Sequence, residues 1–175
     1  MSDTAAKFAF AGQAFLNPEP AHLTALAREL DDHAILQALQ HRPDHLEPAY
    51  NNLFFNPAGT PCPPWQSAHG EEGRLMGDAH LRVLDWFRRH GIEPRTTTDP
   101  ADHVGLILLF YSQLLRGKAD PEDVEAFSRD HLQWIPDYCE CIMRNTTHPF
   151  YRLLAERLNQ WVQEIRNAPE TEPQP

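Results

Sequence analysis

An aspartate beside a histidine is the pair of side chains in this sequence best suited to chemistry. Asp102 and His103 directly precede Val104 to Tyr111, a run that is apolar almost throughout. A carboxylate can bind a cationic group, and a carboxylate with an imidazole can also transfer protons. An acid in the first turn of a helix, with a histidine next to it, is also common where neither residue has a further function. These two residues alone leave both interpretations open.

The other reactive side chains indicate neither a nucleophile nor a metal centre. Ser67, Ser112 and Ser128 lie in no recognisable nucleophile motif, and the ten histidines show no metal-ligand spacing. Cys139 and Cys141 are two residues apart on a predicted helix, where side chains point about 200° apart and cannot both reach one ion. The sequence therefore predicts no catalytic residue, no metal site and no resident cofactor.

Composition favours a soluble protein with a basic partner. The chain has 175 residues, 41% of them hydrophobic, and a net charge of −10. This acidity disfavours nucleic acid and anionic membranes and favours an arginine-rich peptide. Three cysteines, including Cys62, are too few and too unevenly spaced for a disulfide framework, which favours a reducing compartment. The acidic N-terminus is unlike a signal peptide, and the longest apolar run is far shorter than the roughly 20 residues of a membrane span. We therefore expect a cytoplasmic protein.

Apolar residues recur at helical spacing along most of the chain, and no region alternates with a period of two. The predicted helices are 5–16, 23–30, 35–39, 46–54, 78–90, 100–116, 121–132, 136–143 and 149–165. This pattern predicts an all-α fold, a single globular domain of about ten helices with short connections.

Aspartates mark the start of three of these helices. Asp78 follows a glycine, and Asp99 and Asp120 each precede a proline, so each is expected to be an N-cap. On this interpretation Pro100 is the first residue of the apolar helix, and Asp102 lies in its first turn.

The predicted domain covers residues 1–168, and the Pro- and Glu-rich residues 169–175 predict a disordered tail. The connector 92–99 is the expected seam between two helical halves, with a hinge near 92–103 that includes Asp99 and Pro100. The two halves would be 1–91 and 100–168.

The segment 56–67 is rich in proline, so we expect it to run extended over the surface. It carries Trp65, which is either exposed there or folded back as a lid on the core. This segment and residues 93–103 flank one half of the predicted fold, so the two can come together beside Asp102 and His103.

Six short motifs, in this order, resemble the TorD/DmsD family of redox-enzyme maturation chaperones, and its DmsD branch in particular. They are Leu53-Phe54-Phe55-Asn56-Pro57, Pro63-Pro64-Trp65-Gln66-Ser67, Gly77-Asp78 followed by Trp86, Asp99-Pro100-Ala101-Asp102-His103, His131-Leu132-Gln133-Trp134-Ile135-Pro136 and His148-Pro149-Phe150-Tyr151-Arg152. The resemblance covers Tyr50 to Ile165, and the first fifty residues match only in being helical.

The resemblance implies an all-α cytoplasmic chaperone without catalytic activity. Such a protein would bind the twin-arginine signal peptide, or the N-terminus, of a molybdopterin-dependent reductase of the dimethyl-sulfoxide reductase class. It would hold the apoenzyme back from export until the cofactor is loaded. Some relatives are suggested to bind guanine nucleotides weakly, although this chain has no Gly-x-x-x-x-Gly-Lys loop.

The family's leader-binding residues can be carried over by motif. Trp65 matches the Trp of a Pro-Trp-Glu-Ser loop, and Asp102 and His103 match the last two residues of a Glu-Pro-x-Asp-His motif. Gln66 and Asp99 each replace a family Glu, and His69 stands where a Tyr is usual. The expected signal-peptide-binding residues are Trp65, Gln66, Ser67, Trp86, Phe87, Asp102, His103 and His131.

A twin-arginine leader presents two guanidinium groups followed by an apolar helix-former. We expect Asp102 to pair with arginine, and Trp65, Trp86 and Phe87 to line a groove for the apolar part. Replacing Asp102 or Trp65 with alanine should then weaken leader binding and leave helicity unchanged.

Several alternatives stay open at this point. The client is either an exported molybdoenzyme, a cytoplasmic nitrate-reductase-like subunit without a functional leader, or a non-molybdenum metalloenzyme. A small helical hydrolase or nucleotide-binding protein that uses His103 with Asp102 is the alternative from another class. The protein is either a monomer or a dimer that exchanges halves across the seam.

Overall fold

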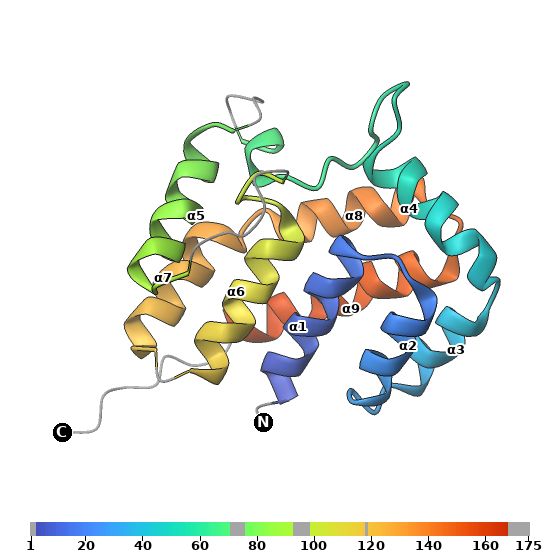
Figure 1. Ribbon diagram of the computed structural model, residues 1–175, viewed down its shortest axis with the longest axis horizontal. Helices are drawn as coiled ribbons and strands as arrows, with labels where there is room; N and C mark the ends of the chain where they lie inside the picture. Colours follow the sequence, from blue (N-terminus) through green and yellow to red (C-terminus); the bar gives the residue numbers. More distant parts are fainter. Residues whose placement is uncertain (1–2, 71–75, 93–98, 118, 168–175) are drawn as a thin grey trace.

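Helices α1 (Asp3–Leu16) and α6 (Val104–Arg116) lie side by side near the centre of the molecule, with α9 (Pro149–Arg166) against α1 (Figure 1). The structure is a computed structural model that describes residues 3–70, 76–92, 99–117 and 119–167. The remaining elements are α2 (Pro20–Arg28), α3 (His33–Gln40), η1 (Pro43–His45), α4 (Leu46–Phe54), η2 (Gln66–Ala68), α5 (Asp78–Arg89), α7 (Pro121–His131) and α8 (Ile135–Asn145). In these ranges all regular secondary structure is helical, so the predicted all-α, single-domain fold is confirmed.

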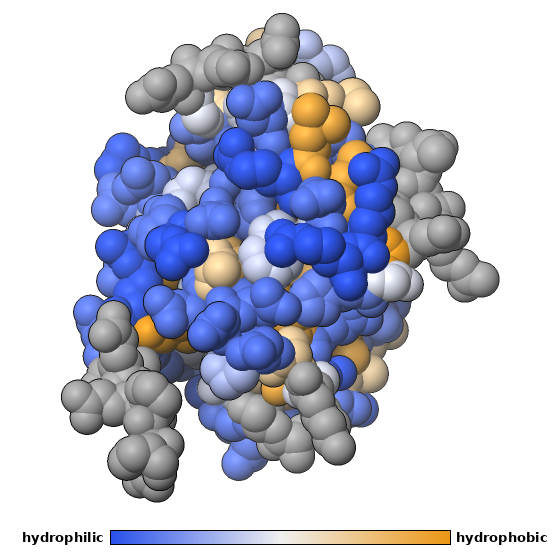
Figure 2. Space-filling model, turned by 90° about the vertical axis from the view of Figure 1, so that its left-hand side faces the viewer, coloured by the Kyte–Doolittle hydropathy of each residue, from blue (hydrophilic) through white to orange (hydrophobic). Residues whose placement is uncertain are grey.

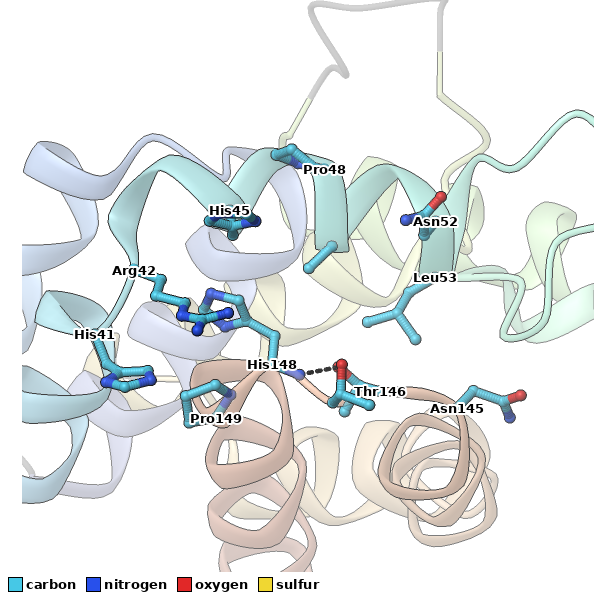
Figure 3. A pocket seen from close by; sticks show the side chains of 12 residues that line it. His41, Arg42, His45, Pro48, Asn52, Leu53, Asn145, Thr146, His148 and Pro149 are labelled. Atoms are coloured by element: carbon cyan, nitrogen blue, oxygen red, sulfur yellow. Dashed lines mark hydrogen bonds between the residues drawn. The ribbon is translucent and has the colours of Figure 1, made fainter.

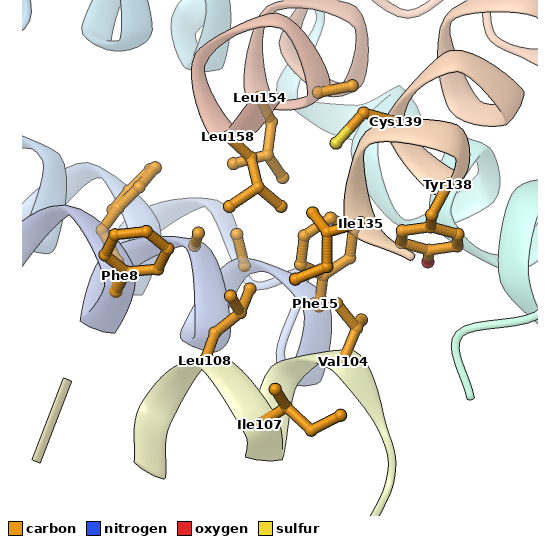
Figure 4. Packing of buried hydrophobic residues seen from close by; sticks show 14 of the residues in the cluster. Phe8, Phe15, Val104, Ile107, Leu108, Ile135, Tyr138, Cys139, Leu154 and Leu158 are labelled. Atoms are coloured by element: carbon orange, nitrogen blue, oxygen red, sulfur yellow. The ribbon is translucent and has the colours of Figure 1, made fainter. Parts of the chain in front are cut away.

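The core is built from apolar side chains that the central helices turn toward one another (Figure 4). Phe8 and Phe15 of α1 meet Leu108 of α6, with Leu154 and Leu158 of α9 above them, and all five are buried. Tyr50 of α4 ties a neighbouring helix to this core, since its hydroxyl donates to the Phe15 carbonyl at 2.7 Å. Among the described helices, none combines the length and the apolar character that a bilayer crossing requires.

Two glycines permit the close approach of α1 and α6. A Cβ added at Gly105 would lie 2.8 Å from the Gly12 carbonyl oxygen, and one added at Gly12 would lie 2.8 Å from the Gly105 carbonyl oxygen. Because both neighbours are backbone atoms, a side chain at either position forces the helices apart.

We therefore expect Gly105→Ala to lower the free energy of unfolding by about 2 kcal/mol. In a chain of this size that loss lowers Tm by about 5 °C in a thermal melt followed by circular dichroism. Gly70→Ala is the matched control, because the nearest atom to its added Cβ is the Ser67 carbonyl at 3.9 Å. Equal melting temperatures for the two variants would contradict tight packing between α1 and α6.

Most helix ends follow the sequence signals, with two exceptions. Asp120 caps α7 through the Glu122 amide, and Gly117 follows the last residue of α6 as expected. Asp78, predicted as an N-cap, is instead the first residue of α5, and Gly77 is the N-cap.

The second exception is the start of α6, which begins at Val104 and not at Pro100. Its N-cap is His103, whose Nδ1 accepts from the Gly105 amide at 3.1 Å. Residues 99–102 form a turn ahead of the helix, because Asp102 and Val104 bond to another part of the chain. Asp99 is therefore not the cap, and Asp102 lies outside the first turn.

The predicted seam and tail fall mainly on residues 93–98 and 168–175, which lie outside the described residues. The division of the chain into two halves stays a prediction, as does the hinge at Asp99 and Pro100. Across the proposed division, α1 packs on α6 and α9, and α3 packs on α9.

Candidate functional site

The proline-rich loop and the turn ahead of α6 are joined by three hydrogen bonds. The loop passes over the start of α6 on its way from α4 to α5 (Figure 1). Gln66 N donates to the Asp102 carbonyl at 3.0 Å, and Val104 N donates to the Pro64 carbonyl at 2.7 Å. Ser67 N donates to Asp102 Oδ2 at 2.8 Å. The predicted meeting of the proline-rich segment with Asp102 is confirmed for the part of both segments that the structure describes.

Trp65 and His103 form an antiparallel bridge at the centre of this junction. Their ring centroids are 6.1 Å apart, in an edge-on arrangement. Trp65 is half-buried, so it is neither fully exposed nor a lid closed over the core. Its Nε1 is buried without a hydrogen-bond partner, which leaves one donor of the junction unused.

Asp102 is fully buried and holds the loop in place. Its side chain has 0% exposure, and Oδ2 carries the bond to Ser67. Oδ1 has no hydrogen-bond partner, because the nearest imidazole, that of His80 at 3.8 Å, accepts from Ala101 N through the same Nδ1. In this arrangement an incoming guanidinium cannot reach Asp102, whose side-chain and backbone oxygens accept hydrogen bonds from the Trp65 loop.

His103 is a neutral helix cap. Because its Nδ1 accepts from Gly105, the proton of the neutral ring lies on Nε2. Burial lowers the pKa of His103 to about 4, although the carboxylates of Asp99 and Asp102 act to raise it. The buried, uncharged ring is a poor candidate for an accessible acid or base.

Gln66 joins the loop to the end of α7 through both ends of its carboxamide. Its Nε2 donates to the Asp130 carbonyl at 3.0 Å, and its Oε1 lies 2.8 Å from His131 Nδ1. Burial lowers the pKa of His131 to about 4, with the charge of Asp130 acting to raise it. A glutamate at position 66 could accept from His131 but could not donate to the carbonyl, so glutamine is the residue that satisfies both partners.

The accessible part of the junction is aromatic and acidic. Phe55 is 41% exposed and packs edge-on against the half-buried Trp65, with the two ring centroids 6.1 Å apart. Asp99 is also half-buried, and its charge acts on His103 and Tyr50. Phe55 was not among the predicted site residues, and Asp99 was predicted only as part of the hinge. His103 packs on Trp65 and Tyr50 packs on Phe55, so Asp99 is linked to both exposed rings through these neighbours. We call Phe55, Trp65 and Asp99 together the aromatic–acidic edge.

Trp86 and Phe87 lie elsewhere, in a buried cluster between α5, α6 and α7. Trp86 packs edge-on against Phe127, and Phe87 packs against Phe110. Seen from the side of α5 and α7, the surface is covered mainly by hydrophilic residues (Figure 2). These two aromatic side chains are therefore core residues and do not line an open groove, contrary to expectation. Their link to the junction runs through Phe127, whose ring centroid lies 4.8 Å from that of His131.

A disulfide anchors the other end of the loop. Cys62 and Cys141 are bonded, with their Cα atoms 6.0 Å apart, whereas Cys139 is free and buried. The bond was not predicted, because three unevenly spaced cysteines indicate no disulfide framework and favour a reducing compartment. The bond ties the residue just ahead of Pro63-Pro64-Trp65 to α8. No spacing rule could reveal it, because the two cysteines are 79 residues apart.

The fold and the junction define an all-helical protein that presents an anchored, tryptophan-bearing loop beside an acidic turn. Residues 17–140 match the family model described as nitrate reductase delta subunit. The chain belongs to this family, that of the TorD/DmsD redox-enzyme maturation chaperones.

Two curated relatives carry the name Tat proofreading chaperone DmsD. The one from Salmonella typhi is 30% identical over 127 residues, and the one from Salmonella typhimurium is 29% identical over the same length. The matched region is 69% of this chain and 62% of each relative, so the match spans less than two thirds of their length.

A crystal structure assigned as a redox enzyme maturation protein, from Archaeoglobus fulgidus, has the same fold. Its TM-score is 0.73 at 22% identity, with 93% of this chain and 94% of that chain covered.

Proposed function

We propose that this protein is a cytoplasmic chaperone that binds the twin-arginine signal peptide, or the N-terminus, of a molybdopterin-dependent oxidoreductase. It retains the client until the client's cofactor is loaded. The observation that carries the proposal is the aromatic–acidic edge, which is built on the loop that Asp102 holds in place. The names of the curated relatives support the same role.

The chemistry of the edge suits a leader peptide. Guanidinium groups pair with carboxylates, and the apolar part of a leader packs on aromatic surface. Because Asp102 is buried, we propose that a leader arginine pairs with Asp99, the half-buried carboxylate of the same turn. Phe55 and Trp65 then take the apolar part, in place of the buried Trp86 and Phe87.

Gln66, Ser67, Asp102, His103 and His131 have a supporting role in this proposal. They hold the loop against α6 and α7 through the side-chain bonds of Gln66 and Asp102 and through the bridge between Trp65 and His103. Asp102→Ala is therefore expected to weaken leader binding through displacement of Trp65, and to lower stability as well, because the Ser67 amide loses a charged acceptor.

An enzyme that uses His103 with Asp102 would need an accessible base, and neither residue provides one in this geometry. Asp102 has 0% exposure and His103 has 1%, and the histidine Nδ1 is engaged as a helix cap. The chaperone proposal leaves the client as an exported molybdoenzyme, with a cytoplasmic or non-molybdenum client as the other outcomes of an interaction screen.

We expect Trp65→Ala to raise the Kd for a synthetic twin-arginine leader peptide at least about tenfold, because a central aromatic anchor is lost. Asp99→Asn should raise the Kd about threefold, since a partly exposed ion pair contributes less. Isothermal titration calorimetry measures both values.

Leu81→Ala is the control for the loss of an exposed apolar side chain that is not one of the three residues of the edge, because Leu81 is 59% exposed on α5. Its Kd should equal that of the wild type, and circular dichroism should show the same helicity for all variants. Unchanged affinity in both Trp65→Ala and Asp99→Asn would rule out the edge as the binding surface.

A further inference from the structure

The disulfide joins α8 to the segment that connects the two aromatic rings of the aromatic–acidic edge. Phe55 comes seven residues before Cys62 in the sequence, and Trp65 comes three residues after it. One proline precedes Cys62 and two more separate it from Trp65, so this short stretch of backbone is stiff. A restraint applied at Cys62 is therefore passed along the chain to the Trp65 ring.

The two sulfur atoms differ in their access to solvent. Cys62 has 0% exposure, whereas Cys141 is half-buried on α8. An external thiol therefore reaches the sulfur of Cys141 first. Cys139 does not compete for either partner, because it is buried and its burial raises the pKa of its thiol. Cys62 and Cys141 thus form a pair that can be opened from the α8 side.

The neighbours of the pair make contacts that do not need the bond. Cys62 N donates to the Leu53 carbonyl at 3.1 Å. Cys141 Sγ lies 3.2 Å from the Pro61 carbonyl oxygen, to which the thiol of the reduced form can donate. Asn145 Nδ2 lies 3.6 Å from Cys141 Sγ and 3.8 Å from Cys62 Sγ. Because these contacts survive reduction, both sulfurs stay within reach and the bond can form again.

Two of these neighbours, Leu53 of α4 and Asn145 of α8, lie at the same end of the pocket between α4 and the start of α9 (Figure 3). The bond therefore lies where the loop passes from α4 to α8. Breaking it leaves the loop attached to these helices only by the weaker contacts, which hold Trp65 less firmly.

The proposed location of this protein is a reducing compartment, where most disulfides are transient and redox-sensing. We propose that the Cys62–Cys141 bond is a reversible redox switch for leader binding. The oxidised form fixes the Trp65 loop on α8 and binds the leader peptide more tightly, and the reduced form binds it more weakly. This inference rests on the proposed function, because it concerns regulation of the same binding surface.

The switching step is thiol–disulfide exchange with a small thiol such as glutathione. A glutathione thiolate attacks Cys141 Sγ, a new S–S bond forms there, and the Cys62 sulfur leaves as a thiolate and takes up a proton. A second glutathione thiolate then attacks the sulfur of the first glutathione. Cys141 leaves as a thiolate and is protonated in turn. Two electrons pass to the cysteine pair, and glutathione ends as its disulfide, which drives the reverse reaction when it is in excess.

The first measurement follows the bond without any leader peptide. The full chain is equilibrated in glutathione buffers from fully reduced to fully oxidised, quenched with acid, alkylated and weighed by mass spectrometry. We expect the bond to be absent in reduced glutathione and present in oxidised glutathione. A bond that persists in every buffer, or one that never forms, would overturn the switch.

The second measurement compares leader affinity in the two forms by isothermal titration calorimetry. Reduction should raise the Kd about threefold to tenfold, because a loosened loop must be ordered on binding. Cys141→Ser cannot form the bond and keeps a donor for the Pro61 carbonyl, so its Kd should equal that of the reduced wild type in both buffers. Cys139→Ala keeps the pair and should respond as the wild type does. Equal Kd values for the two wild-type forms would overturn the switch and leave the proposed function standing.

The third measurement separates the switch from the proposed function. Backbone amide shifts of Trp65 and Gln66 are compared in the oxidised and reduced chain without leader peptide, with Cys141→Ser as the control that should show no change. We expect both amides to move on reduction, and unmoved amides would show that the bond does not control the loop. If neither form binds a leader peptide, the proposed function fails and leader regulation fails with it, whereas moved amides would still support redox control of the loop.

Discussion

We expect the free energy of unfolding to fall by several kcal/mol as the pH is lowered from 6.5 toward 4, because His103 and His131 are buried in their neutral forms. Burial lowers both pKa values to about 4 in the folded state, from an ordinary value of 6.5. Between these pH values the unfolded chain binds more protons than the folded chain, so stability rises with pH and is complete above 6.5. Each histidine contributes up to about 3 kcal/mol to this dependence.

Urea unfolding at a series of pH values measures this effect. His103→Asn retains a helix-capping side chain and removes one titrating group, so the dependence between pH 6.5 and 4 should become about half as steep. His33→Gln replaces an exposed histidine and should leave the profile unchanged. A profile that is equally steep in wild type and His103→Asn would show that His103 is not held neutral by burial.

Loss of the Cys62–Cys141 bond is expected to lower the free energy of unfolding by about 4 kcal/mol. The bond closes a loop between residues 79 positions apart, and a cross-link over that distance greatly reduces the freedom of the unfolded chain. Its removal also frees the start of the Trp65 loop from α8, so affinity for a leader peptide should fall.

Urea unfolding with and without dithiothreitol tests this prediction. The double variant Cys62→Ala with Cys141→Ala should have the stability of the reduced wild type and should not respond to dithiothreitol. Cys139→Ala keeps the bond, because Cys139 is the free cysteine, and should still respond. If the wild type is equally stable with and without the reductant, the bond does not contribute to the folded state.

Helical periodicity was sufficient to predict the all-α fold, because an amphipathic stripe is a local property of the sequence. The start of α6 was not predicted correctly. The Asp99-Pro100 signal is sound by local rules, but a long-range bond from Val104 N to the Pro64 carbonyl and the His103 cap define the real start. Local capping rules carry no information about such a tertiary bond.

For the site too, the sequence predicted which segments carry the residues but not which of their side chains the tertiary fold would bury. The positions of the two flanking segments correctly predicted that the Trp65 loop meets Asp102, but they do not reveal which side chains end up buried. Asp102 is fully buried, and Trp86 and Phe87 lie in the core. An apolar stripe looks the same in sequence whether it faces a core or a groove. The Cys62–Cys141 pair depends on the tertiary fold alone.

The proposed function requires that a client's leader peptide docks on the aromatic–acidic edge. The most direct measurement is a map of backbone amide shifts of the full chain on addition of a twin-arginine leader peptide. The proposal predicts that the shifted amides include Trp65, Gln66 and Asp99 and their neighbours, and that a peptide with lysines in place of both arginines shifts them less. Shifts confined to α3 and α9, with the Trp65 and Gln66 amides unmoved, would contradict it.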